Sequence, residues 1–374
     1  MTERRIRVLV VDDSAFARKV VREVLASDGE IEVIGIARDG LEALELIEAK
    51  KPDVITLDLT MPNLDGLGVL RALRAAAPHP VPRCVIVSTS DEQSDLAVQA
   101  LVEGAVDVVH KPTALATDRL YDLASDLVAK VKAAFPARPM IVTGEPSASI
   151  ASSVRPTRRA GELRAVVIAT STGGPQALTQ LLTDLPRDLP VPVAMVLHIP
   201  AGYTASLAKR LDETAGLDVV EAHEGLAMRP GLAILARAGR QMQIVVARPR
   251  TRTPEESALR ARNAAGGPSE EGADPDCIVT LGAHIETAHV PSADVLFESA
   301  AKAYGGRVLG VVLTGMGQDG LQGARAIRAA GGMVFSEAAT SCVVYGMPRS
   351  IFEAGLSNRV VPLRGMAEAI AQAL

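Results

Sequence analysis

Tryptophan is absent from this chain of 374 residues, and aromatic residues of all kinds make up only 2% of it. Platforms that stack nucleic-acid bases need aromatic side chains, so the composition argues against a nucleic-acid partner. The formal net charge of -5 likewise gives no general attraction for nucleic acid or acidic lipid. No apolar run reaches the roughly 20 residues that cross a bilayer, so we expect no direct membrane insertion.

Cysteine is also scarce. The three cysteines, Cys84, Cys277 and Cys342, stand far apart in the sequence and fit no metal-binding spacing. We therefore expect free thiols in a reducing compartment. The first residues lead directly into a predicted strand rather than into the apolar core of a signal peptide, and we expect a cytoplasmic protein.

The remaining composition, 48% hydrophobic and 22% charged, is typical of a globular protein, and the length favours two domains. Residues 1–135 alternate strand and helix patterns five times, which predicts a (βα)5 doubly wound parallel sheet. Residues 136–163 are rich in Pro, Ser, Gly and Arg, which indicates a linker. Strand–helix alternation resumes over residues 164–374 and predicts a second, mostly parallel α/β domain. A charged, Gly- and Pro-rich insertion interrupts it at residues 248–276.

Polar residues stand where the predicted strands of the first domain end, and the carboxyl ends of parallel strands meet at one edge of a sheet. They are Asp12, Asp13, Asp58, Ser88 and Lys111. Three carboxylates at one edge repel each other unless they hold a cation, and their hard oxygen ligands suit Mg²⁺. A carboxylate beside a metal can attack a phosphoryl group, while a lysine and a hydroxyl stabilise the transferred oxygens. The full set favours this interpretation over solvated strand-end charges.

These residues closely resemble the receiver domains of bacterial two-component response regulators, over about residues 5–132. The resemblance implies that Asp58 accepts a phosphoryl group from a sensor histidine kinase. It also implies that Mg²⁺ is bound by Asp12, Asp13 and Asp58, with the carbonyl of Thr60 as a further ligand.

The same resemblance implies that Ser88 is the switching hydroxyl and Lys111 the lysine of the phosphorylation site. One departure concerns Val108, which stands where the family usually has Tyr or Phe. We therefore expect the aromatic switch to be weaker or absent.

The segment VVIATSTGGPQAL, residues 166–178, predicts a strand, a sharp glycine turn and a helix start, with Ser171 on the turn. This geometry can expose a serine hydroxyl and aim free backbone N–H groups at the group it attacks. Taken alone, the turn can equally be a phosphate cradle or a plain connection.

A nucleophilic serine needs a base and an acid that orients the base. Of the six histidines, His198 is best placed, because it directly follows a buried strand pattern at the same expected edge as Ser171; His223 is its rival. Asp319 lies on a glycine-rich loop after the strand pattern of residues 308–313. Alone, Asp319 is most often a helix cap; beside Ser171 and His198 it becomes the orienting carboxylate. The same loop can supply the N–H of Met316 to an oxyanion hole.

Five motifs, STGGP, LHIPAGYT, PSADVLFESAA, LTGMGQDG and VVYGMPR, are together similar to the chemotaxis protein-glutamate methylesterase/glutaminase domain, over about Arg164 to Leu374. A receiver joined to this domain by a linker is the arrangement of that family. The resemblance implies a Ser-His-Asp triad of Ser171, His198 and Asp319, with Thr172 and Met316 at the oxyanion.

It further implies a phosphorylation-activated serine hydrolase that acts in chemotaxis adaptation. This enzyme would demethylate glutamyl methyl esters on methyl-accepting chemoreceptors and deamidate receptor glutamines. Mg²⁺ would serve the receiver domain only, and the esterase would need no cofactor. The unphosphorylated receiver would cover the triad.

Departures from the family pattern are Gln241, in a stretch that usually carries a histidine, and Ala338, after Glu337, where two acids are common. Two alternatives stay open: a non-catalytic, phosphorylation-dependent binding protein, and a paralogue acting on a non-chemotaxis receptor. A nucleotide site at STGGP is disfavoured, because a Walker lysine and the full GxGxxG spacing are missing.

Overall fold

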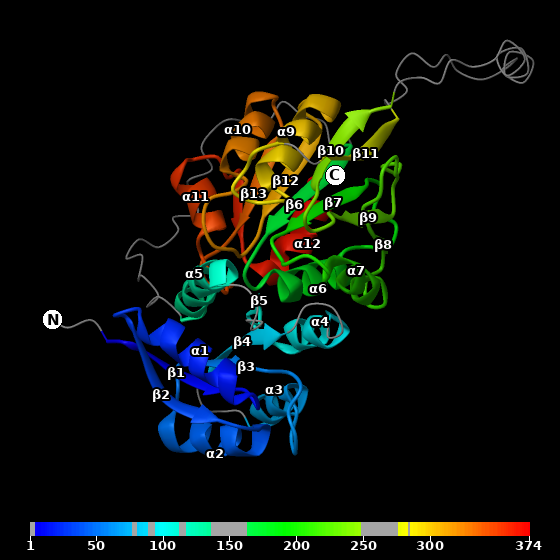
Figure 1. Ribbon diagram of the computed structural model, residues 1–374. Helices are drawn as coiled ribbons and strands as arrows, with labels where there is room; N and C mark the ends of the chain where they lie inside the picture. The colour runs from blue at the N-terminus through cyan, green and yellow to red at the C-terminus, as the bar shows by residue number, and fades with distance from the viewer. Residues whose placement is uncertain are drawn as a thin grey trace, which may run out of the picture.

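The computed structural model describes residues 4–76, 81–88, 94–111, 117–135, 163–247, 276–282 and 285–374. The predicted linker and insertion lie almost wholly outside these residues, and so do two of the six histidines, His79 and His284. The described chain forms two α/β halves, one blue to cyan and the other green to red in Figure 1. Among the described helices, none combines the length and the apolar character needed to cross a membrane.

The first half is a parallel sheet in the order β2-β1-β3-β4-β5. Its strands are β1 (Ile6–Val11), β2 (Ile31–Ala37), β3 (Val54–Leu57), β4 (Arg83–Ser88) and β5 (Asp107–His110). Its helices are α1 (Ala15–Ala26), α2 (Gly40–Lys50), α3 (Gly66–Ala75), α4 (Ser94–Glu103) and α5 (Thr117–Ala134). The strand order reverses between β1 and β3, and a ligand site of an open parallel sheet lies at such a point.

Local chemistry explains where the helices of the first half begin. Three of them follow a residue whose side-chain oxygen accepts a hydrogen bond from a backbone N–H of the first turn: Ser14, Asp39 and Asp65. The strands are rich in β-branched and aliphatic residues, and all four side chains of β3 are buried. The (βα)5 prediction is confirmed.

The second half is a parallel sheet in the order β14-β13-β12-β6-β7-β9-β8. Its strands are β6 (Ala165–Thr170), β7 (Val193–Leu197), β8 (Asp218–Glu221), β9 (Leu232–Leu235), β12 (Val308–Val312), β13 (Met333–Glu337) and β14 (Arg359–Val361). Its helices are α6 (Gly174–Asp184), α7 (Thr204–Asp212), α9 (Ala293–Tyr304), α10 (Leu321–Ala329), α11 (Met347–Glu353) and α12 (Leu363–Ala371). The fully buried strand β6 lies at the centre, between β12 and β7.

A separate two-stranded antiparallel sheet of β10 (Gln241–Val246) and β11 (Cys277–Gly282) is added to this half. The sequence patterns do not predict β11, β14, α11 or α12. β14 has only three residues, and both β11 and β14 are edge strands that pair with one neighbouring strand, so their residues carry little periodic signal. The mostly parallel α/β architecture itself is confirmed.

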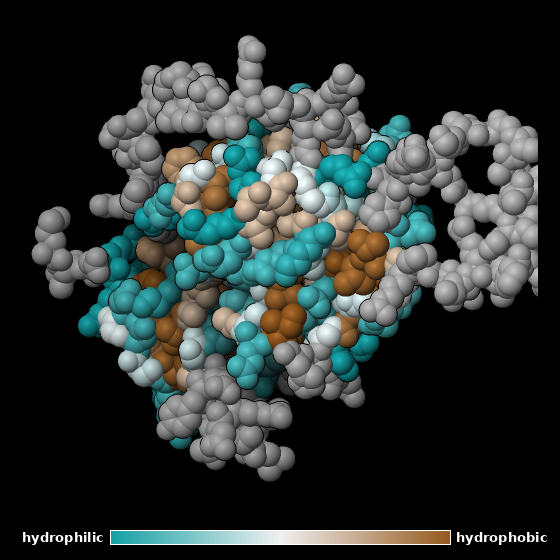
Figure 2. All heavy atoms as spheres, turned by 90° about the horizontal axis from the view of Figure 1, so that it is seen from above, coloured by the Kyte–Doolittle hydropathy of each residue, from teal (hydrophilic) through white to brown (hydrophobic). Residues whose placement is uncertain are grey.

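The two halves pack directly on each other. Figure 1 shows α4 beside α6 and α7, and apolar residues of both halves form one continuous cluster. Viewed from above, the surface of the second half shows small hydrophobic clusters separated by hydrophilic residues (Figure 2). The contact between the halves runs beside the turn that carries Ser171, because the N–H of Gly173 donates to the carbonyl of Val106 in the first half.

Candidate active site

The turn of residues 170–174, called the nucleophile turn after the role predicted for Ser171, leaves the central strand β6 at its carboxyl end. Gly173 has a φ of 79°, a conformation that favours glycine, and a Cβ there would come within 2.7 Å of the Val343 side chain. The helix α6 starts directly afterwards, with Pro175 in its first turn. The turn thus places a half-buried Ser171 at the edge of the sheet, as the sequence predicts.

His198 follows the neighbouring strand β7, and its backbone N–H donates to the carbonyl of Thr170 at 3.1 Å. Its Nε2 lies 2.8 Å from Oδ2 of Asp319. A carboxylate only accepts hydrogen bonds, so neutral His198 carries its proton on Nε2. Its Nδ1 is buried and has no partner among the described residues, which leaves a lone pair available to take a proton.

Asp319 reaches His198 from the loop after β12. The carboxylate also accepts hydrogen bonds from the Ser292 hydroxyl at 2.9 Å and from the backbone N–H groups of Ala293 at 2.7 Å and Asp294 at 3.1 Å. Burial alone would raise the pKa of Asp319, but His198 and the N–H groups of Ala293 and Asp294 outweigh it and lower the pKa to about 2. Asp319 is therefore ionised at neutral pH.

Asp319 does not cap the helix that follows it but contacts the start of an earlier helix. The helix that follows it, α10, begins after Gly320 and has no side-chain cap. Asp319 instead lies at the first turn of α9, which comes earlier in the chain. The partial positive charge of that helix start stabilises the carboxylate.

The three predicted triad residues thus come from the ends of three adjacent strands, β12, β6 and β7. The two predicted oxyanion donors, the N–H groups of Thr172 and Met316, make no hydrogen bond to any other described residue. Gly315, beside Met316, lies so close to Ser171 that a Cβ at Gly315 would come within 2.8 Å of Cβ of Ser171. The arrangement can support attack by a serine on a carbonyl carbon.

The sequence interpretation does not identify His289 as a residue of this site. Its ring stacks on that of His198, with centroids 4.1 Å apart and planes inclined by 14°. Burial, and then the nearby His198, lower the pKa of His289. The only sequence signal is its place two residues before the PSADVLF motif.

Gln241 explains how His289 is held. This buried side chain donates to the carbonyl of His289 at 3.1 Å and to Thr287 Oγ1 at 2.6 Å, and accepts from the N–H of Ser292 at 2.8 Å. The family departure at position 241 therefore supports the segment that carries both His289 and a hydrogen-bond donor to Asp319.

The first half bonds directly to the nucleophile turn. The hydroxyl of Thr172 donates to Oδ2 of Asp107 on β5 at 2.6 Å, and the N–H of Gly173 donates to the carbonyl of Val106 at 3.0 Å. Gln176 on α6 donates to the carbonyls of Leu101 and Ala105. The Thr172 side chain therefore faces the first half, while its backbone belongs to the site.

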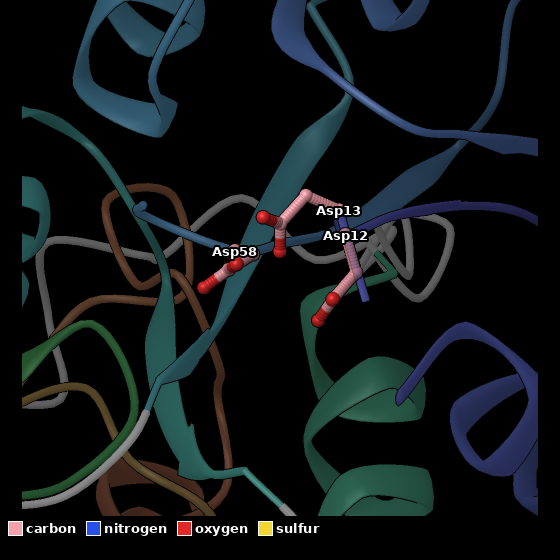
Figure 3. A group of neighbouring side chains, drawn as sticks. All are labelled: Asp12, Asp13 and Asp58. Carbon is pink, nitrogen blue, oxygen red and sulfur yellow. The ribbon is translucent and has the colours of Figure 1, made fainter. Parts of the chain in front are cut away.

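The predicted carboxylate cluster is present at the switch point of the first sheet. Ligand oxygens of Asp12, Asp13 and Asp58 lie within 4.8 Å of one another, and Figure 3 shows the three side chains next to one another. Lys111 Nζ lies 3.0 Å from Asp12 and 2.9 Å from Asp58. Burial raises the pKa of both these carboxyls, against the opposing effect of Lys111. The all-oxygen donor set fits Mg²⁺.

The other residues considered for the receiver site lie at or near the ends of β4 and β5. Ser88 is fully buried at the end of β4, and its carbonyl accepts the N–H of Lys111 at 2.6 Å. Val108 is fully buried on β5, where it packs in the core. His110, at the end of β5, makes a ring contact with Tyr203 of the second half at 5.6 Å.

The sequence matches the Response regulator receiver domain family over residues 8–123 and the CheB methylesterase family over residues 166–370. A protein-glutamate methylesterase/protein-glutamine glutaminase of Myxococcus xanthus is 52% identical over 96% of both chains. A protein of the same name from Symbiobacterium thermophilum is 41% identical over 100% of this chain and 98% of its own. The solved catalytic domain of Thermotoga maritima CheB is 31% identical, with a TM-score of 0.48, over 57% of this chain and 99% of its own.

Two matched domains in this order, with relatives similar over nearly their whole length, leave one assignment. The chain belongs to the protein-glutamate methylesterase/protein-glutamine glutaminase family of response regulators.

Proposed function

We propose that Ser171, His198 and Asp319 are the catalytic triad of this enzyme, and that its substrates are glutamyl methyl esters and glutamines of a methyl-accepting chemoreceptor. The observation that carries the proposal is the hydrogen bond between His198 Nε2 and Asp319, with Nδ1 of His198 left unpartnered. This bond fixes the tautomer in which Nδ1 is the base.

In this mechanism Nδ1 of His198 takes the proton of the Ser171 hydroxyl as Oγ attacks the γ-carbonyl carbon. The backbone N–H groups of Thr172 and Met316 hold the resulting oxyanion, and each such donor contributes on the order of 3 kcal/mol in related enzymes. His198 returns the proton to the methoxy oxygen, and methanol leaves. Water, deprotonated by the same atom, then hydrolyses the acyl-enzyme to glutamate. With a glutamine substrate the leaving group is ammonia.

The first half controls this chemistry through Asp58. A sensor histidine kinase supplies the phosphoryl group, and Asp12, Asp13 and Asp58 hold Mg²⁺. When bound, Mg²⁺ supplies positive charge to the phosphoryl oxygens. Ser88 and Lys111 contact the transferred oxygens in this scheme. The bonds from Thr172, Gly173 and Gln176 to the first half support a resting state in which that half restrains the nucleophile turn.

The division of the chain forms part of the proposal. Residues 1–135 are the receiver domain, 136–163 the linker and 164–374 the catalytic domain. Figure 1 is consistent with these limits, because one sheet lies before residue 135 and the other after residue 164. Phosphorylation of Asp58 then adds charge at one end of β3 and shifts the packing between the halves.

The decisive experiment measures methanol release from methylated receptor by the full chain, with and without a small-molecule phosphodonor. We expect Ser171→Ala to abolish release and Asp58→Asn to keep basal release but lose activation. Ser350→Ala is the matched control, because Ser350 bonds only within its own helix region. Unchanged release by a folded Ser171→Ala protein would show that the triad is wrong. Full activation of Asp58→Asn would refute the control mechanism while the esterase stood.

A further inference from the structure

Glu337, the last residue of β13, is a carboxylic acid with no exposed surface. Its Oε2 accepts the backbone N–H of Thr314 at 2.8 Å, and its Oε1 accepts the hydroxyl of Ser341 at 2.8 Å. No ion pair joins it to a basic group of the described chain. Burial raises the pKa of Glu337. Burying a carboxylic acid without a paired cation costs free energy. Here one of its hydrogen-bond partners is a backbone N–H near the active site.

Thr314 connects Glu337 to the nucleophile turn. Its carbonyl accepts the N–H of Ser171 at 3.0 Å and the hydroxyl of Thr170 at 2.7 Å. Its own hydroxyl donates to the carbonyl of Thr172 at 3.0 Å and accepts the N–H of Val344 at 2.9 Å. One buried residue therefore touches the backbone on both sides of the Ser171 side chain.

The chain beyond Thr314 has little freedom to compensate for a displacement. Gly315 donates to the carbonyl of Val344, and its own carbonyl accepts the N–H groups of Gly346 and Met347. A Cβ on Gly346 would come within 2.7 Å of that carbonyl oxygen. The oxyanion donor of Met316 is the next N–H along the chain. Its distance from Ser171 is thus set by the bonds that Thr314 makes.

We propose that Glu337 and Thr314 are positioning residues of the acyl-transfer reaction, which align the oxyanion donor of Met316 with the nucleophile Ser171. The inference rests on the proposed function, since it takes Ser171 as the nucleophile. Glu337 acts as a hydrogen-bond acceptor for the N–H of Thr314 and not as a charge that meets the substrate. Ser341 holds the carboxylate from the other side, and its own Oγ accepts the N–H of Leu363 at 3.0 Å.

The first test compares Glu337→Gln with Glu337→Leu in the full chain, with phosphodonor and methylated receptor. Gln keeps an acceptor oxygen for Thr314, whereas Leu fills a similar volume without one. We expect Glu337→Gln to retain kcat within about 3-fold, and Glu337→Leu to lower kcat by about 10- to 100-fold with KM within about 2-fold. Labelling of Ser171 by a fluorophosphonate, which needs no receptor, is expected to slow in parallel with kcat.

Thr314→Val and Thr314→Ser form a second pair that leaves Glu337 in place. Val has the shape of Thr without the hydroxyl, and Ser keeps the hydroxyl. We expect Thr314→Val to lower kcat by about 10-fold or more at unchanged KM, and Thr314→Ser to stay within about 3-fold of the parent. This pair decides the matter if Glu337→Leu does not fold, as thermal unfolding will show.

Three outcomes would overturn the inference. The first is wild-type kcat in both a folded Glu337→Leu protein and Thr314→Val. The second is an equal loss of kcat in Glu337→Gln and Glu337→Leu, and the third is a change confined to KM. Ser171→Ala separates this failure from that of the proposed function. If Ser171→Ala is inactive and the Leu and Val variants are fully active, only the positioning role is wrong. If Ser171→Ala is active, both proposals are overturned.

Discussion

The imidazole of His289 lies stacked on that of His198, at 4.1 Å between centroids. In the proposed mechanism, attack by Ser171 creates an imidazolium at His198, and we expect the stacked ring to restrict both its orientation and its access to water. We predict that His289→Ala lowers kcat by about 10-fold, while His289→Phe, which keeps a ring, loses less than about 3-fold. Steady-state methanol release by the two variants is the measurement. Equal losses in both would show that the stacking is irrelevant.

Because the pKa of His289 is lowered in the folded protein, we predict that the free energy of unfolding depends on pH. A histidine whose pKa in the folded state lies below its unfolded value binds its proton more weakly when folded. The wild type therefore loses stability, relative to His289→Phe, as pH falls below about 6.5 and through the folded pKa. Urea unfolding of both proteins at pH 8, 6.5 and 5 checks this. A difference that is independent of pH would contradict it.

The ionisation of Asp319 affects stability at a lower pH than that of His289. Its pKa of about 2 in the folded state lies below its ordinary value of 3.8, so the folded state favours the ionised form. The resulting stability, about 2 kcal/mol, is complete above pH 4 and is lost as pH falls toward 2. Unfolding free energies of wild type and Asp319→Asn should differ most at neutral pH and converge in acid. At neutral pH the variant should also lose about 10⁴-fold in kcat, because Asn does not fix the His198 tautomer.

Gln176 offers a way to loosen the contact between the halves without touching the triad. Its two hydrogen bonds to carbonyls of the first half are worth about 2 kcal/mol together. We predict that Gln176→Ala raises basal methanol release of the unphosphorylated protein by up to about 10-fold. Thr179→Ala on the same helix is the control, since the Thr179 hydroxyl donates to the carbonyl of Pro175 within α6 and not to the first half. No rise in basal activity would mean that this contact does not restrain the site.

The carboxylate cluster predicts a metal requirement confined to the receiver reaction. Asp13→Asn should weaken Mg²⁺ binding by at least about 10-fold, measured by calorimetry, and should weaken activation by phosphodonor accordingly. Basal methanol release should be insensitive to a chelator, because no step of the esterase mechanism uses the metal. Loss of basal release on chelation would contradict this separation.

The residues that the sequence predicts best are those that follow regular strands. Ser171, His198 and Asp58 could be placed because parallel strands deliver their ends to one edge, and strand periodicity is readable. Asp319 required one more step, since its loop is irregular, but its position after β12 limited the choices. The same reasoning could not determine that its partner N–H groups belong to α9 rather than α10.

Roles that depend on side-chain contacts between residues distant in the sequence could not be predicted from the sequence. His289 lies on an irregular segment whose path depends on Gln241, 48 positions away in the chain. Asp107 reads as an ordinary strand residue, and only the packing of the halves brings it to Thr172. The burial of Glu337 could not be predicted either, because an acid at the end of a strand suggests solvent exposure. In the structure, β14 and the chain beyond β13 cover it.

The backbone N–H of Thr172 is one of the two proposed oxyanion donors, and the hydroxyl of the same residue donates to the carboxylate of Asp107. Coupling of this kind is reciprocal by thermodynamic necessity. If phosphoryl binding at Asp58 changes the affinity of the site for a ligand, occupancy of the site must change the affinity for the phosphoryl group by the same factor. Under that condition, a receptor bound at the site would alter the affinity of the first half for the phosphoryl group.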